Sequence, residues 1–143
     1  MNKTDSRERS VLLLFETDSK EQDVKTTLDS LEVAPDQYAV ELLGSFSEFE
    51  EKVNTLISDN SKGWSTDRMP AMDRAILRMA VTELVRDAKT PVGTVISEAV
   101  SLCEKYSTPE SPKFINGVLG TIAHKVRGVE LLQGNKATSD QEK

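Results

Sequence analysis

The segment with the most distinctive chemistry lies near the C-terminus, where Lys113, Phe114 and Asn116 accompany two glycines, Gly117 and Gly120. An ammonium can contact a phosphate, an aromatic ring can stack on an unstacked base, and an amide can bond to a base edge or a ribose. Each glycine inside a helix costs about 1 kcal/mol relative to alanine, so the pair indicates a face that another molecule approaches closely. Helical spacing places both glycines opposite the apolar stripe. These residues are therefore candidates for RNA contact, and the alternative is an ordinary solvated face with Phe114 at the edge of the core.

The charge distribution gives this segment a basic character within an acidic protein. The net charge of −6 argues against a general nucleic-acid binder, because phosphate affinity comes mainly from lysine and arginine. Residues 1–67 hold 7 basic and 15 acidic side chains, whereas residues 68–143 hold 11 and 9. Between residues 105 and 127, four basic residues face the single acidic Glu110. We therefore expect a local basic patch whose binding is sensitive to salt.

Signatures of catalysis and of metal binding are scarce. His124 is the only histidine and Cys103 the only cysteine, which excludes a multi-cysteine zinc site. Cys103 falls in an apolar stripe, where a thiol usually serves as packing. A Cys–His pair brought together by folding is the remaining enzymatic alternative. We expect no catalytic residue, no metal and no other cofactor.

The N-terminal region offers two further candidate surfaces. Arg7 and Arg9 are either phosphate contacts or a solubilising first turn. The apolar run over residues 11–15 that follows them points in five directions about 100° apart, which one core face cannot absorb. Either neighbouring helices cover this element on nearly all sides, or Leu12 or Leu13 is part of a homodimer or partner surface.

The first half of the chain is predicted to form three helices, and no alternating strand pattern occurs in the sequence. The first helix is expected over about residues 6–17. A short second helix is expected to begin at a capping box made by Ser19 and Gln22 and to end near Leu31. Pro35 suits the first turn of a long third helix that stops within residues 58–63.

The second half is predicted to form three more helices. Residues 70–87 are apolar around most of the circumference and predict a central, mostly buried helix, whose polar strip of arginines is either simply exposed or a charged docking edge. An amphipathic helix follows Pro91. Ser111 as N-cap and Pro112 at the first helical position then begin the helix that carries the glycines. The arginines of the strip are Arg74, Arg78 and Arg86.

The domain organisation expected from this pattern is a single helical domain over residues 1–127 and a flexible tail over residues 128–143. No stretch approaches the roughly 18 continuous apolar residues of a membrane helix, and the N-terminus has no signal-peptide core. We expect a cytoplasmic protein without a membrane partner.

Four ordered blocks of this sequence carry a resemblance to a known family. They are RERSVLLLFE (residues 7–16), MDRAILRMAVTEL (72–84), TPVGTVISEAV (90–100) and SPKFINGVL (111–119). Together they resemble the NusB family of transcription antitermination factors over nearly the whole chain. Two positions depart from the family pattern: Ser97 stands where asparagine is common, and Gly120 stands where an acidic residue often occurs.

The resemblance implies an all-α fold of about seven helices packed as two small sub-bundles, and no enzymatic activity. It implies a factor that binds boxA RNA of nascent ribosomal transcripts together with NusE, the small-subunit ribosomal protein, within the transcription elongation complex. The alternative is a helical protein–protein interaction or homodimerising module without RNA specificity. The RNA contacts implied by the resemblance are Arg7, Arg9, Lys113, Phe114 and Asn116. The NusE-facing residues it implies are Asp73, Arg74 and Glu83.

Overall fold

The computed structural model describes residues 2–62 and 68–128, and within these ranges the chain forms six α-helices. The all-α class expected from the sequence is confirmed, with six helices in the described part in place of about seven. None of these helices is long and apolar enough to cross a membrane. The helices are α1 (Lys3–Ser19), α2 (Val24–Asp29), α3 (Gln37–Asp59), α4 (Ala71–Arg86), α5 (Val92–Tyr106) and α6 (Ser111–Arg127).

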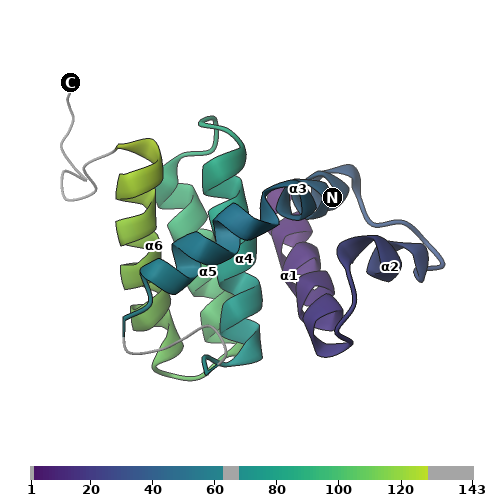
Figure 1. The fold of residues 1–143 in the computed structure, drawn as a ribbon, viewed down its shortest axis with the longest axis horizontal. Helices are drawn as coiled ribbons and strands as arrows, with labels where there is room; N and C mark the ends of the chain where they lie inside the picture. Colours follow the sequence, from purple (N-terminus) through teal and green to yellow (C-terminus); the bar gives the residue numbers. More distant parts are fainter. Residues whose placement is uncertain (1, 63–67, 129–143) are drawn as a thin grey trace.

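The helices form two groups that α3 connects (Figure 1). On one side α1 and α2 pack against each other and against α3, and on the other side α4, α5 and α6 pack together. Helix α3 leaves the first group and crosses α4 on its way to α6, and its backbone departs from helical geometry at Phe49. The C-terminal end of α3 therefore lies beside α6, although about 50 residues separate the two segments in the sequence.

One hydrophobic core runs through both groups. Helix α4 lies at its centre and packs against α1, α3, α5 and α6. The core takes side chains from all six helices, including Val11 of α1 and Ile115 of α6, both fully buried. The central, mostly buried helix predicted over residues 70–87 is confirmed as α4.

The starts of α2 and α3 differ from the sequence expectation. Asp23 caps α2 by accepting a hydrogen bond from the Thr26 N–H at 2.8 Å, and Asp36 caps α3 in the same way. The predicted capping box at Ser19 is wrong because α1 continues to Ser19, and Glu21 then takes a left-handed conformation (φ 53°) that turns the chain. A carboxylate next to each first turn also interacts favourably with the helix dipole.

The two ends of α6 are set by different chemistry. Ser111 is not an N-cap, because its hydroxyl is buried and donates to Asp73 Oδ2 of α4 at 2.7 Å. At the other end, Gly128 adopts φ 63° and its N–H donates to the carbonyl of His124, as a left-handed C-cap requires. The predicted tail begins at Gly128, and its residues 129–143 lie outside the described part of the chain.

Most of the apolar run in α1 is covered by its neighbours, which favours the first of the two alternatives. Helix α1 contacts α2, α3, α4 and α5. Leu13 is 2% exposed and belongs to the core, whereas Leu12 is half-buried. The suggested partner surface at Leu13 is therefore corrected: a side chain packed inside the bundle cannot form a dimer contact without unfolding.

Candidate nucleic-acid interface

Arg7 belongs to a buried ion cluster that joins four helices. Its Nε donates to both carboxylate oxygens of Glu83 at 2.8 and 2.9 Å, and its guanidinium also reaches Glu98 at 3.1 Å. Tyr38 donates to the same Glu83 carboxylate. Burial is the largest single influence and opposes the charge on Arg7, but the hydrogen bonds and charges of Glu83 and Glu98 together outweigh it and raise the pKa of the guanidinium. Arg7 is only 4% exposed, so the expectation that it contacts RNA is corrected: it holds α1 against α4 and α5.

The expected NusE-facing carboxylates are also internal. Asp73 is fully buried and accepts hydrogen bonds from the hydroxyls of Ser107 and Ser111, which join α4 to the turn between α5 and α6. Glu83 is 1% exposed within the cluster described above. Neither carboxylate is accessible to a partner. A buried charge is stable only when its hydrogen bonds are satisfied, and here groups inside the protein satisfy them.

The arginine strip of α4 is used to tie helices together. Arg74 Nε donates to Asp18 of α1 at 2.9 Å, and Arg78 Nε donates to Asn54 of α3 at 3.0 Å. Arg86 Nε donates to the Ser45 hydroxyl of α3 at 3.1 Å. The alternative of a free charged docking edge is therefore not supported. Arg74 keeps a side-chain exposure of 16%, which is the accessible remainder of the expected partner site.

The structure divides the basic residues of the 105–127 segment into two pairs. Lys105 forms an ion pair with Glu8 at 2.6 Å, and Arg127 donates to the backbone carbonyls of Thr90 and Asp87 at 2.6 and 2.8 Å. Lys113 and Lys125, by contrast, have no carboxylate within 4 Å among residues 2–62 and 68–128. Their charges are therefore available to an anionic ligand.

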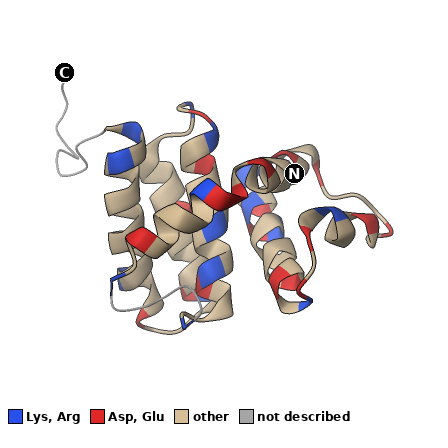
Figure 2. Cartoon of the chain, in the orientation of Figure 1, with Lys and Arg blue, Asp and Glu red and all other residues tan. Residues whose placement is uncertain are grey.

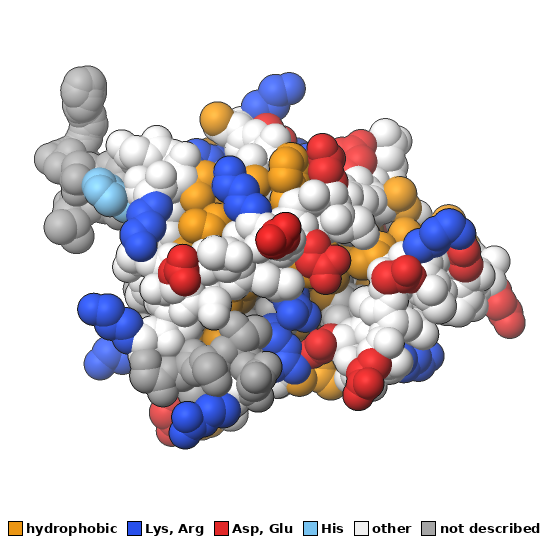
Figure 3. Space-filling model, in the orientation of Figure 1, with side chains coloured by type: hydrophobic (Ala, Val, Ile, Leu, Met, Phe, Trp, Pro, Cys, Tyr) orange, Lys and Arg blue, Asp and Glu red, His pale blue; other side chains and the backbone are white. Residues whose placement is uncertain are grey.

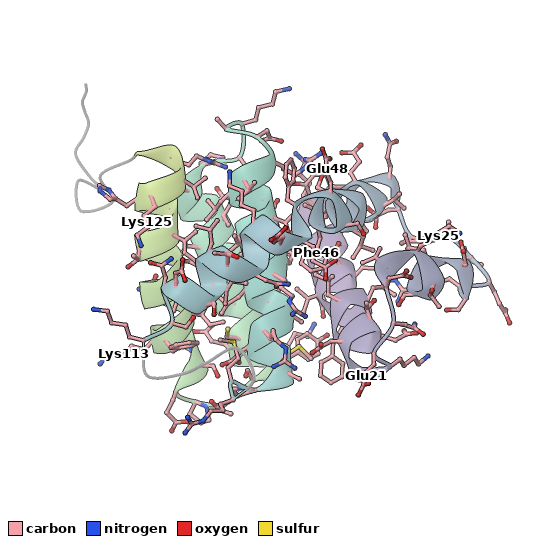
Figure 4. The ribbon with its side chains drawn as sticks, viewed as in Figure 1. Glu21, Lys25, Phe46, Glu48, Lys113 and Lys125 are labelled. Atoms are coloured by element: carbon pink, nitrogen blue, oxygen red, sulfur yellow. The ribbon has the colours of Figure 1, made fainter. Side chains whose placement is uncertain are left out.

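The outer face of α6 carries the residues that the sequence singled out. Lys113, Asn116 and Gly117 are exposed, and Phe114 is half-buried against the core. Lys113 points away from the bundle (Figure 4), whereas Lys125 reaches toward the end of α3, where its Nζ donates to Asn60 Oδ1 at 2.6 Å. Helix α6 contains no acidic residue (Figure 2). A Cβ added at Gly117 would meet no atom within 4 Å, which confirms that this glycine faces outward. In the space-filling view, basic side chains occur along the margin that α6 forms (Figure 3).

Two open hollows flank Lys113. The first, of about 770 Å³, lies between α6 and the end of α3, and Phe114 and Gly117 also line it. The second, of about 840 Å³, lies between α5 and α6 and is lined by Asn116 together with the two departures from the family pattern, Ser97 and Gly120. Lys113 thus stands on the ridge between them, within reach of a ligand on either side.

Arg9 lies on a different helix from the α6 candidates for RNA contact. It is half-buried on α1, and α4 and α5 lie between α1 and α6 (Figure 1). Helix α5 packs against both α1 and α6, so a ligand that touched Arg9 and Lys113 together would cross α5. The residue that sequence reasoning did not select is Lys125, which lies twelve residues after Lys113 on the same helix and lines the same hollow.

The two residues considered for catalysis, Cys103 and His124, differ in burial. Cys103 is fully buried, and burial raises the pKa of its thiol to about 12, so it stays protonated and unreactive at neutral pH. His124 is exposed on α6. The described residues contain no cluster of three side chains suited to bind a metal.

Comparisons with known proteins agree with this architecture. A model of the NusB family matches residues 4–124. The transcription antitermination protein NusB of Saccharopolyspora erythraea is 38% identical, with 82% of this chain and 84% of that protein covered. The NusB protein of Streptomyces avermitilis is 36% identical, with 82% and 88% covered.

Solved structures show the same likeness. A crystal form of T. maritima NusB superposes with a TM-score of 0.77 at 28% identity and covers 87% of this chain and 92% of its own. A crystal structure of the antitermination factors NusB and NusE in complex with double-stranded RNA superposes with a TM-score of 0.72 at 26% identity, with 86% and 96% covered.

Proposed function

The chain belongs to the NusB family, and we propose that it is a non-enzymatic RNA-binding factor for transcription antitermination. It binds the boxA element of nascent ribosomal transcripts together with the ribosomal protein NusE, within the transcription elongation complex. The names of its relatives support the antitermination role. The related complex of NusB, NusE and RNA supports the choice of partners.

The observation that carries the proposal is the outer face of α6. Lys113 offers an ammonium with no carboxylate of the described residues within 4 Å, Asn116 offers an exposed amide, and Gly117 leaves room for a close approach. Phe114 supplies an aromatic edge beside them. Arg9 adds a phosphate contact from α1, whereas Arg7 serves the fold.

For the protein partner, the proposal keeps one of the three expected residues as a direct contact. Arg74 has an accessible edge on α4 and contacts NusE there. Asp73 and Glu83 act indirectly, because they fix the position of α4 against α1, α5 and α6.

The test is a titration of labelled boxA RNA followed by fluorescence anisotropy, with and without NusE, and against a scrambled RNA. Lys113→Glu should weaken binding while leaving the helical circular dichroism unchanged, because the side chain is exposed. The matched control is Lys25→Glu, because Lys25 lies on α2 in the other helix group (Figure 4). About three phosphate contacts predict a log–log salt slope near −2.

Two results would contradict the proposal. One is the absence of boxA binding both with and without NusE. The other is equal affinity for boxA and the scrambled RNA under both conditions, which would indicate charge attraction without recognition.

A further inference from the structure

The hollow between α6 and the C-terminal end of α3, called the α3–α6 hollow below, is lined by different kinds of residue on its two sides. Helix α6 contributes positions 113, 117, 121 and 125, which follow one another at a spacing of four and so form a row that winds over about a third of the helix circumference. The end of α3 contributes Asp59, Asn60 and Lys62. Lys113 and Lys125, the two long side chains of this row, lie at its ends. Gly117 and Thr121 between them project little from the helix.

The charge of the α3–α6 hollow favours an anion in spite of the acidic chain around it. Three lysines line it, Lys62, Lys113 and Lys125, together with two acidic residues, Asp59 and Glu110. No ion pair within 4 Å joins these five residues to each other or to other parts of the described chain. The lysine charges are therefore not neutralised by direct ion pairs, and they exceed the acidic charges of the lining by one.

One of these lysines is held in place by a neutral partner. Lys125 Nζ donates to Asn60 Oδ1 at 2.6 Å, which fixes the ammonium between α6 and α3. Because the amide carries no charge, this bond orients the cation without neutralising it. An ammonium fixed in this way loses less conformational freedom when it binds a phosphate.

The middle of the hollow suits a flat, partly apolar group. Phe114 is half-buried there, beside Val118 and the bare backbone of Gly117. Lys113 and Lys125 are twelve residues apart on α6, or about 18 Å along the helix. That length corresponds to roughly five nucleotides stacked at about 3.4 Å each.

From this geometry we propose that the α3–α6 hollow holds a short single strand of RNA, with Lys62 and Lys125 binding its phosphates in addition to Lys113 and with a base against Phe114. The proposal rests on the RNA-binding function proposed above and deepens it, since it states the path of the strand. It makes Lys125, Lys62 and Gly117 determinants of affinity.

The first experiment measures boxA affinity and its salt dependence for Lys125→Gln and Lys62→Gln in the full chain with NusE. Each variant should lower the magnitude of the log–log salt slope by about 0.7, which at 0.1 M salt corresponds to about five-fold weaker binding. Lys25→Gln is the matched control, because it removes the same charge from an exposed site on α2, and it should leave the slope unchanged.

The second experiment tests shape without changing charge. Gly117→Leu places a side chain in open space inside the hollow, and Gly44→Leu does the same on the exposed face of α3. Both variants should melt about 3 °C higher than the parent, because leucine favours helix more than glycine does. Only Gly117→Leu should weaken RNA binding, by about five-fold or more, as the loss of one phosphate contact would.

The remaining outcomes decide between the two proposals. If Lys113→Gln weakens binding while the Lys62, Lys125 and Gly117 variants do not, the path through the hollow is refuted and the proposed function stands. The path is also refuted if Lys25→Gln loses as much RNA affinity as Lys62→Gln and Lys125→Gln. It is refuted as well if a duplex of the same sequence binds as tightly as the single strand. If the parent protein binds no RNA, both proposals fail.

Discussion

The buried cluster around Glu83 makes a quantitative prediction about stability. Glu83→Gln keeps the shape of the side chain but removes the negative charge that pairs with Arg7 Nε at 2.8 Å. Arg7 cannot lose its proton, so its charge would stay inside the bundle with Glu98 as its remaining carboxylate at 3.1 Å. The Tyr38 hydroxyl would also lose a charged acceptor.

The expected loss follows from the burial of the pair. Breaking a buried ion pair by removing one partner costs about 3–5 kcal/mol. Glu98 retains part of the interaction, which places Glu83→Gln near the lower end, at about 3 kcal/mol. For a chain of this size, each kcal/mol lowers Tm by roughly 2–4 °C, so the midpoint should fall by about 10 °C.

The assay is thermal unfolding followed by circular dichroism at neutral pH, with Arg7→Met/Glu83→Met as the second variant. Replacing both charges with apolar groups should recover most of the loss, because both members of the buried pair are removed and the remaining Glu98 side chain is 23% exposed to water. Arg7→Met should bind boxA like the parent below its melting temperature. A Tm within 3 °C of the parent for Glu83→Gln, or a loss of RNA affinity in folded Arg7→Met, would refute this account of the cluster.

Two further predictions concern single titratable groups. The hydroxyl of Ser6 and the N–H of Ala39 hold the pKa of Asp36 below its usual value. Its contribution to folding is therefore complete above about pH 4 and is lost as the pH falls through the folded-state pKa. Asp36→Asn keeps the cap, so its free energy of unfolding, measured with urea, should fall less than that of the parent between pH 5 and about pH 2. Asp36→Ala should lower the free energy of unfolding by about 1 kcal/mol at pH 7. An unchanged pH dependence in Asp36→Asn would contradict this. Because burial raises the pKa of Cys103 to about 12, a thiol reagent at pH 8 should modify it only after unfolding, and rapid labelling of the native protein would count against the buried position.

The order of the helices and the outward face of α6 could be predicted from the sequence because both depend on local periodicity. The spacing of Ile115, Val118 and Ile122 defines the buried stripe of α6, and the opposite side then carries Lys113 and Gly117. The buried stripe residues and the open position at Gly117 confirm that pattern. Helix starts were less predictable, because several polar residues near each start could serve as caps.

The buried charges could not be placed from the sequence because their partners are distant along the chain. Arg7 and Glu83 are 76 residues apart, and Asp73 and Ser111 are 38 apart. One signal was present: Asp73 and Glu83 lie outside the arginine strip of a helix that is otherwise apolar around most of its circumference. A charge at such a position needs an internal partner, which favours a structural role over a surface contact.

The open position at Gly117 has a consequence for attempts to engineer this protein. The helix would gain about 0.3–1 kcal/mol from most ordinary side chains there, and a Cβ at this position meets no atom within 4 Å. Selection for heat resistance in the isolated protein would therefore favour replacing this glycine. If the hollow carries a transcript, such improved variants would be poorer binders, a trade-off that melting curves alone would never reveal.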